Sequence, residues 1–180
     1  IVNPNTKLLE AAFILVYSDD NMISGETFAF TTLCSLLKTR FEITFEECAD
    51  FLGVDLCHNM EGGTFSVSMK SFTKKFLASC AITTPHPYPI FSPGLTNMKI
   101  TRDPAAARAL VPDANYRKKA GSLNWLVMAL RYDINYSTKE LSRVADCPTV
   151  DADYLMGRAL NYISQTADAR LVYDRASILR

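Results

Sequence analysis

Apolar and polar positions near the start of the chain predict a β-hairpin with acidic residues at its tip. An unbroken apolar run, residues 13–17, has the pattern of a buried strand. The turn-forming stretch of residues 18–21 follows and contains Asp19 and Asp20, and a second short run then ends at Gly25. We therefore expect two antiparallel strands whose connecting turn displays both carboxylates.

A covering helix and a second hairpin are expected next. From residue 27 to about residue 40, apolar side chains recur at the three- and four-residue steps of an amphipathic helix. Residues 51–57 and 64–69 then flank a glycine-containing loop and have the pattern of two paired strands. In the second of these strands, Phe65, Val67 and Met69 are expected to point inward. A helix that presents Phe72 and Phe76 on one face follows.

Prolines interrupt the middle of the chain. Six of the eight prolines lie between residues 83 and 115: Pro85, Pro87, Pro89, Pro93, Pro104 and Pro112. Because proline lacks the backbone N–H and fixes φ, this segment cannot form a regular element. We predict a connector here, between a mixed α/β front part at residues 1–82 and a helical back part.

The back part has the periodicity of three helices, at about residues 116–131, 135–145 and 151–165. Asp151 is a candidate cap for the third of them. In the sequence "RLVYD" near the end, polar and apolar residues alternate enough to predict a short strand or a linker. The whole pattern indicates an α+β chain, with β-hairpins and a covering helix first and an α-helical bundle afterwards.

Composition and charge narrow the class of protein. The chain has 180 residues, 48% of them hydrophobic, which is enough for a core, and its nineteen basic and nineteen acidic residues give zero formal charge. A nucleic-acid surface would therefore have to be local. No apolar run reaches the roughly 20 residues of a membrane span. Because the chain begins at Ile1 and lacks a signal-peptide pattern, we expect a piece of a longer polypeptide.

Cysteine and histidine give no sign of a zinc site. The five cysteines are widely spread without a C-x-x-C pair, which is typical of thiols in a reducing compartment. The two histidines, His58 and His86, stand at no ligand spacing from a cysteine pair and are expected to be ordinary surface residues.

The paired acids of the first hairpin have two interpretations. A tight turn that presents two carboxylates can supply ligands to Mg²⁺, which prefers oxygen atoms. Two such ions about 3.5 to 4 Å apart can activate an attacking hydroxyl and stabilise a leaving group in nucleotidyl transfer. An ordinary Asp-containing turn is the simpler interpretation of the dipeptide alone, since Asp is favoured in turns for local hydrogen-bonding reasons.

The order of several motifs separates these interpretations. "YSDD" follows an apolar strand, "FLG" stands at residues 51–53, and "YRKKAGSLNWL" lies beyond the proline-rich segment. In this order they resemble the C-terminal half of a copia-type retrotransposon reverse transcriptase. The resemblance implies part of a polymerase palm at residues 1–82, a connector at 83–115, a helical thumb at 116–169 and, at 170–180, a linker towards a ribonuclease H region.

The resemblance also implies an activity. It is that of an RNA-directed DNA polymerase, which adds dNTPs to a primer on an RNA or DNA template with two Mg²⁺ or Mn²⁺ ions. The remainder of the Pol polyprotein would be its partner, and its place would be a cytoplasmic virus-like particle with a nuclear stage and no membrane. A third metal-binding acid would come from an earlier palm strand that this chain lacks. We therefore expect the 180 residues alone to be inactive.

The resemblance gives roles to residues of the front part. Asp19 and Asp20 would be the catalytic metal ligands, and Tyr17 and Ser18 would contact the substrate. For Tyr17, a core residue at a strand end is an equal alternative. The set Phe51, Leu52 and Gly53 would form the primer grip, where glycine permits close backbone approach. The alternative is a plain buried strand with a bulge at the glycine.

The back part would supply a nucleic-acid face. Arg117, Gly121 and Trp125 stand four residues apart and share one side of a helix. By resemblance, that side would lie along the minor groove of the template-primer duplex, with Lys118 adding charge for phosphates. The alternatives are a core role for Trp125, close helix packing at Gly121, and a merely solvated helix start for the charged residues.

Two further functions compete with the polymerase. One is a non-catalytic module that binds nucleic acid or protein and derives from a retrotransposon. The other is a small hydrolase or metal-binding domain that uses Asp19 and Asp20 alone, although no His or Glu cluster accompanies them.

Overall fold

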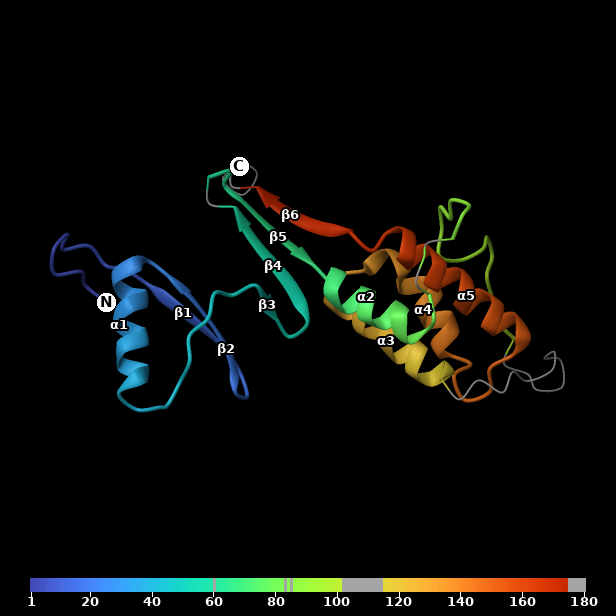
Figure 1. Cartoon of the computed structure of the whole chain (residues 1–180), viewed down its shortest axis with the longest axis horizontal. Coiled ribbons are helices and arrows are strands. Elements are labelled where there is room, and N and C mark those ends of the chain that lie inside the picture. Colours follow the sequence, from blue (N-terminus) through green and yellow to red (C-terminus); the bar gives the residue numbers. More distant parts are fainter. Residues whose placement is uncertain (60, 83, 85, 102–114, 175–180) are drawn as a thin grey trace. The chain divides into compact units, whose positions relative to one another are not determined.

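The computed structural model describes residues 1–59, 61–82, 84, 86–101 and 115–174. The chain divides into two compact units, Ile1–Leu52 and Gly53–Arg180. The predicted segments 83–115 and 170–180 lie only partly within the described residues. The described part is a mixed α and β structure with two small antiparallel sheets, as the sequence indicated (Figure 1).

The first unit is built around the predicted hairpin. Strands β1 (Ala12–Tyr17) and β2 (Asp20–Gly25) pair in antiparallel register, and helix α1 (Thr27–Lys38) follows directly. The carboxylate of Glu10 accepts hydrogen bonds from the backbone N–H groups of Phe28 and Ala29, at 2.9 and 3.2 Å. Glu10 thereby caps the helix from outside, which fixes α1 beside the hairpin.

The β1 strand is exposed, whereas the sequence predicted a buried one. All five residues of the apolar run are exposed, and the ring of Phe13 is 72% accessible. Within this unit α1 contacts both strands, and Ala29 and Phe51 are the buried hydrophobic residues among those that the structure describes. A hairpin and one short helix have too little surface to cover an apolar strand, since small units bury only a modest share of their surface.

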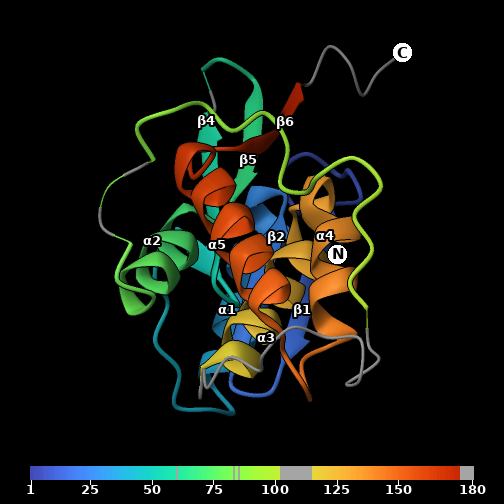
Figure 2. The ribbon, with the colours of Figure 1, turned by 90° about the vertical axis from the view of Figure 1, so that its right-hand side faces the viewer.

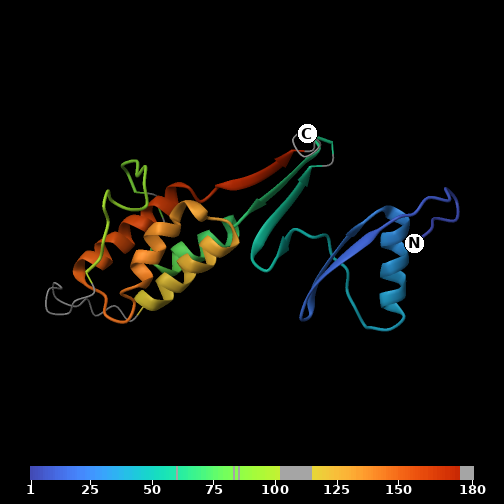
Figure 3. The ribbon, with the colours of Figure 1, turned by 180° about the vertical axis from the view of Figure 1, so that it is seen from behind.

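The second sheet joins distant parts of the chain. Strand β3 (Asp50–Phe51) ends the first unit, and β4 (Val54–Asn59) pairs with β5 (Thr64–Ser68) in the second, as the predicted hairpin required. The "RLVYD" segment forms β6 (Arg170–Asp174), which pairs antiparallel with β5. The β4-β5-β6 sheet extends from the helices of the same unit (Figure 3).

The helices of the second unit enclose its core. They are α2 (Lys70–Ser79), α3 (Tyr116–Ala129), the 3-10 helix η1 (Tyr132–Ile134), α4 (Asn135–Ser142) and α5 (Val150–Gln165). Helix α5 contacts both α2 and α4 (Figure 2). The core includes fully buried leucines and isoleucines from α3, η1, α4 and α5: Leu123, Leu126, Ile134, Leu141 and Ile163.

Part of the predicted connector belongs to this core. Met98 and Ile100 are buried with the helices, and the side-chain amide of Gln165 bonds the backbone of residues 86, 88 and 90. The hydroxyl of Tyr136 donates to the Met98 carbonyl at 2.8 Å. The described part of the irregular segment therefore packs onto the bundle, and the two compact units divide between residues 52 and 53.

Two local expectations differ from the structure. In β5, Val67 packs against the core and Met69 just after the strand is buried, but Phe65 is exposed because it lies towards the end of the sheet that extends away from the helices. The third helix of the back part is capped by Thr149, whose hydroxyl accepts from the Ala152 N–H at 3.2 Å. Asp151 lies inside the first turn of that helix, where its charge favours the helix dipole.

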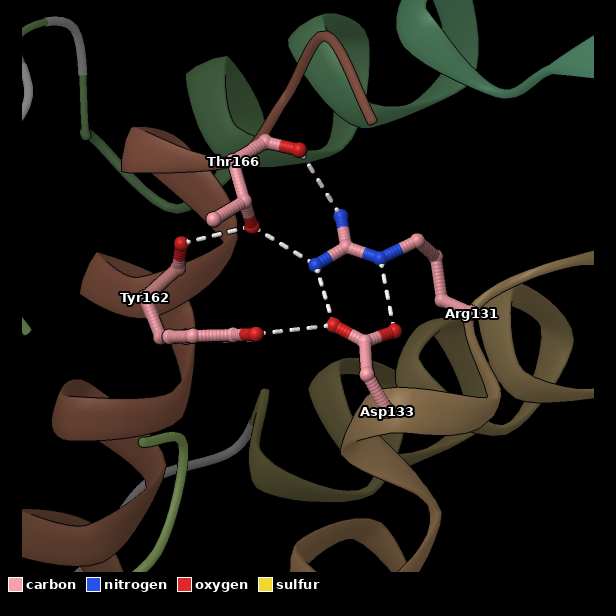
Figure 4. Close-up of polar contacts among 4 residues, drawn as sticks. All are labelled: Arg131, Asp133, Tyr162 and Thr166. Carbon is pink, nitrogen blue, oxygen red and sulfur yellow. Dashed lines mark hydrogen bonds and ion pairs between the residues drawn. The ribbon is translucent and has the colours of Figure 1, made fainter. Parts of the chain in front are cut away.

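A polar network fixes the end of α5 against the α3–α4 junction (Figure 4). The guanidinium of Arg131, 4% accessible, makes two parallel hydrogen bonds to the carboxylate of Asp133, at 2.9 and 2.8 Å. It also donates to the carbonyl and hydroxyl oxygens of Thr166, while the Tyr162 hydroxyl donates to Asp133. Because Thr166 ends α5, the network holds the point from which the chain proceeds to β6.

No helix among the described residues is both long enough and apolar enough for a membrane crossing.

Candidate metal and nucleic-acid sites

The tip of the first hairpin presents the two acids as the sequence predicted. Tyr17 pairs with Asp20, so Ser18 and Asp19 alone form the reversal. Ser18 adopts a φ of +53°, which closes the turn, and its hydroxyl donates to the Asp19 carboxylate at 2.6 Å. Both Asp19 and Asp20 are exposed. The carboxylates therefore follow one another along a backbone that the strand pairing fixes.

This arrangement can supply two oxygen ligands to a hard cation, which is the donor type that Mg²⁺ prefers. Among the described residues, no group of three or more His, Cys, Asp or Glu side chains gathers in a way that could hold a metal ion. The pair thus fits part of a metal site, and water, phosphate or further protein oxygens would have to complete the coordination.

Cys48 lies in the electrostatic field of one of these acids, Asp20, which the sequence analysis missed. Burial raises the pKa of the Cys48 thiol above its ordinary value, and the charges of Asp50 and Asp20 raise it further. Cys48 is far from the hairpin tip in sequence but belongs to the same compact unit. No local motif signals this proximity, because it depends on how the segment after α1 returns.

Tyr17 does not occupy a core in this structure. Its side chain is 59% exposed, so the alternative of a buried strand-end tyrosine is not observed in the described residues. Ser18 is likewise exposed at the turn. Both side chains are accessible to a ligand that reaches the hairpin tip.

The three predicted primer-grip residues form a tight turn. Leu52 and Gly53 both adopt positive φ, +53° and +78°, between β3 and β4. Two consecutive residues in the left-handed region are typical of a two-residue hairpin turn, not of a bulge. Phe51 is buried in its unit, whereas nothing lies within 4 Å of a Cβ placed on Gly53. Gly53 is therefore required by its backbone conformation and leaves open space beside it.

Helix α3 has one exposed side that carries all the predicted nucleic-acid residues. Arg117, Lys118 and Gly121 are exposed, and so is Trp125, at 40%. The core alternative for Trp125 is thus not observed, because Leu123 and Leu126 take the buried positions of this helix. The sequence analysis gave no role to Asn124 or Met128, which are exposed on the same side. An inspection of the complete helical period would have found them.

Gly121 is not needed for helix packing. A Cβ on Gly121 would meet nothing within 4 Å, so the close-packing alternative fails among the described residues. A glycine within a helix costs about 1 kcal/mol relative to alanine. Contacts among the described residues therefore do not explain why a glycine stands at this position. Close approach of a ligand to the helix would explain it.

Two polar side chains on this side of α3 are held by the last residue of α4 and by the segment that follows it. The Arg117 Nε donates to the Ala145 carbonyl at 3.2 Å, and the Asn124 Nδ2 donates to the Ser142 hydroxyl at 3.0 Å. Lys118 and Gly121 lie between them along the helix. We use the name α3 face for Arg117, Lys118, Gly121, Asn124 and Trp125.

No known protein-family model matches the chain. No solved structure resembles it significantly.

Proposed function

We propose that this chain is the C-terminal palm and thumb portion of a copia-type reverse transcriptase, an RNA-directed DNA polymerase. In this proposal Asp19 and Asp20 contribute to the sites of two Mg²⁺ or Mn²⁺ ions, which would supply charge stabilisation for nucleotidyl transfer. The residues Tyr17 and Ser18 contact the incoming dNTP or the primer end. The turn at Leu52 and Gly53 serves as the primer grip.

The observation that carries the proposal is the geometry of the first hairpin. Two carboxylates on consecutive residues are displayed, exposed, at a reversal of only two residues. A cation site needs its ligands held before the ion arrives, and the paired strands provide this without burying the charges. An ordinary Asp turn would satisfy the backbone equally well, so cation binding at the tip is what the experiment has to show.

The α3 face supports a nucleic-acid partner independently of the acids. It is basic at Arg117 and Lys118, open at Gly121 and aromatic at Trp125. Cationic groups neutralise phosphates, and a bare backbone position allows a groove edge to approach the helix closely. We propose that template-primer duplex lies along this face.

Primer extension tests the proposal. We expect the 180-residue chain to bind a primed template but not to extend it, since its described residues supply only two of the required metal ligands. Extension should appear in the longer parent polypeptide and be abolished by Asp19→Asn or Asp20→Asn, with binding retained. Extension that survives both substitutions together would contradict the proposal.

A second function, nucleic-acid binding without catalysis, is favoured by one observation. The unit Gly53–Arg180 contains both its own hydrophobic core and the whole α3 face. If that unit alone binds duplex while the tip acids affect no activity of the parent polypeptide, the binding module is the better description.

A further inference from the structure

Strand β6 is the outermost strand of the second sheet. The strand order is β3-β4-β5-β6, so β6 pairs with β5 on one side, and none of the described strands pairs with its outer edge (Figure 1). All five residues of β6 are exposed. An edge strand directs backbone N–H and C=O groups towards its open side, so a further strand can pair with β6 there.

The outer edge of β6 lacks the features that commonly prevent such pairing. Proteins protect edge strands with proline, with a bulge or with a charge in the middle of the strand. β6 contains no proline, its pairing with β5 runs without interruption from residue 170 to residue 174, and its charged residues stand at its two ends. The three residues between them are large, apolar and 42–55% exposed: Leu171, Val172 and Tyr173.

The sequence of β6 is complementary to itself in the antiparallel direction. Arg170 begins the strand, Asp174 ends it, and Val172 is its midpoint. When two copies of β6 lie antiparallel with Val172 opposite Val172, Arg170 of each copy lies opposite Asp174 of the other. Leu171 of each then lies opposite Tyr173 of the other. Opposite charges and aromatic–aliphatic pairs stabilise neighbouring strands, whereas a parallel alignment in the same register would place like charges opposite each other.

We propose that β6 is a self-association edge, through which two copies of this chain pair antiparallel about a two-fold axis at Val172. Such an axis uses the same surface on both copies, and a self-complementary strand provides this. The β4-β5-β6 sheets of the two copies then form one continuous sheet. The inference goes beyond the proposed function and does not rest on it, because it uses neither the acids of the first hairpin nor the α3 face.

The apolar face of the sheet also becomes continuous in this dimer. The rings of Phe65 and Tyr173 lie side by side, with centroids 6.3 Å apart, and His58 meets Phe65 edge-on at 6.0 Å. Leu171 lies on the same face as Tyr173, because the two stand two residues apart in a strand. Pairing extends this row of side chains onto the Leu171 and Tyr173 of the second copy and removes exposed apolar surface from water.

The size of the contact determines how strong the association should be. Each copy contributes one five-residue strand, whereas a standard stable interface has roughly 20 to 30 residues on each side. We therefore expect a reversible dimer whose fraction rises with the concentration of the chain.

Sedimentation velocity over a series of concentrations tests the pairing by exchange of charge. The unmodified chain should sediment faster as its concentration rises. Arg170→Glu places two acids opposite each other and Asp174→Arg places two bases opposite each other, so each variant should remain monomeric. An equimolar mixture of these two variants restores both opposite-charge pairs and should dimerise, as should the double variant that carries both changes. A variant that had merely lost its fold would not be rescued by mixing.

Two substitutions of exposed strand valines locate the contact. Val172→Lys brings two ammonium groups together at the two-fold axis and should abolish the dimer. Val16→Lys in β1 is the matched control, since Val16 is 63% and Val172 is 55% exposed, and it should leave dimerisation unchanged. A chain that stays monomeric at every concentration would overturn the inference. So would a dimer that persists in Val172→Lys or in both charge variants, or one that only Val16→Lys abolishes, which would assign the association to the first hairpin.

Discussion

Tyr17 and Asp20 face each other as the last residue pair of the β1–β2 ladder, so that the chain reverses through Ser18 and Asp19 alone. This relationship places one acid in the turn and the next acid at the first residue of the returning strand. The backbone of both is fixed by pairing, while their carboxylates remain in solvent. Binding of a cation to these carboxylates would therefore cost little additional backbone conformational entropy.

Substitution of Gly121 should separate stability from binding. Gly121→Ala is expected to stabilise the chain by about 0.5 to 1 kcal/mol, because alanine fits the open position and is the better helix former. The same change should weaken duplex binding, since a methyl group then occupies the closest approach. Gly157→Ala in α5 is the matched control, because its Cβ also meets nothing within 4 Å. It should stabilise similarly without affecting binding, whereas equal effects of both variants on binding would exclude close approach at Gly121.

Removal of the basic residues on α3 should change how binding depends on salt. The Arg117→Ala, Lys118→Ala double variant is expected to bind duplex more weakly at low salt, with the slope of log K against log salt reduced by roughly 1 to 2. Fluorescence anisotropy over a salt series measures this. Lys74→Ala with Lys75→Ala removes two exposed lysines of α2 and should leave the slope unchanged. Equal slopes for both double variants would mean that the α3 charges are merely solvated.

The pH dependence of stability should report the Arg131–Asp133 pair. Burial raises the pKa of Asp133, but the hydrogen bonds and charge of Arg131, together with the Tyr162 hydroxyl, outweigh it and hold the pKa below its ordinary value. A lowered pKa in the folded state means stabilisation that is present above the unfolded pKa of about 3.9 and is lost as the pH falls through the folded value.

Urea denaturation at pH 7 and at acid pH measures that contribution. Asp133→Asn should destabilise the chain at pH 7 by about 1 to 3 kcal/mol, since it removes a charged partner from a buried guanidinium. It should also flatten the decline in stability below pH 4. A variant that declines with acid as steeply as the unmodified chain would show that other carboxyl groups dominate this transition.

The reactivity of Cys48 should follow the charge at the hairpin tip. Burial, Asp50 and Asp20 raise the pKa of its thiol, so the thiolate fraction near pH 8 is reduced. Asp20→Asn should therefore speed the alkylation of Cys48 by iodoacetamide, as followed by peptide mass spectrometry. Cys57, also exposed, provides the internal control. An unchanged ratio of the two rates would place Cys48 outside the field of Asp20.

The periodic parts of the fold could be predicted from the sequence. The first hairpin, α1, the β4–β5 pair and the helices of the back part all appear close to their expected bounds, because each has a clear two- or three-to-four-residue pattern. The packing of Met98 and Ile100 was not predicted. They lie in an irregular segment whose contacts with α4 and α5 come from residues far away in sequence, such as Gln165.

In the candidate site, too, the features set by local sequence could be predicted and those set by distant contacts could not. The positions of Asp19 and Asp20 and the shared side of Arg117, Gly121 and Trp125 follow from local spacing alone. The hydrogen bonds from Asn124 to Ser142 and from Arg117 to Ala145 depend on how α4 packs beside α3. No single-element pattern contains that information, so these groups became visible only in the structure.

The central claim is that the paired carboxylates of the first hairpin bind a divalent cation, and titration with Mn²⁺ under NMR observation tests it most directly. We predict selective paramagnetic broadening of the amide resonances of residues 17–21, lost in Asp19→Asn with Asp20→Asn and retained in the control Asp153→Asn. Unbroadened resonances at the tip, or broadening that persists in the double variant, would contradict the claim.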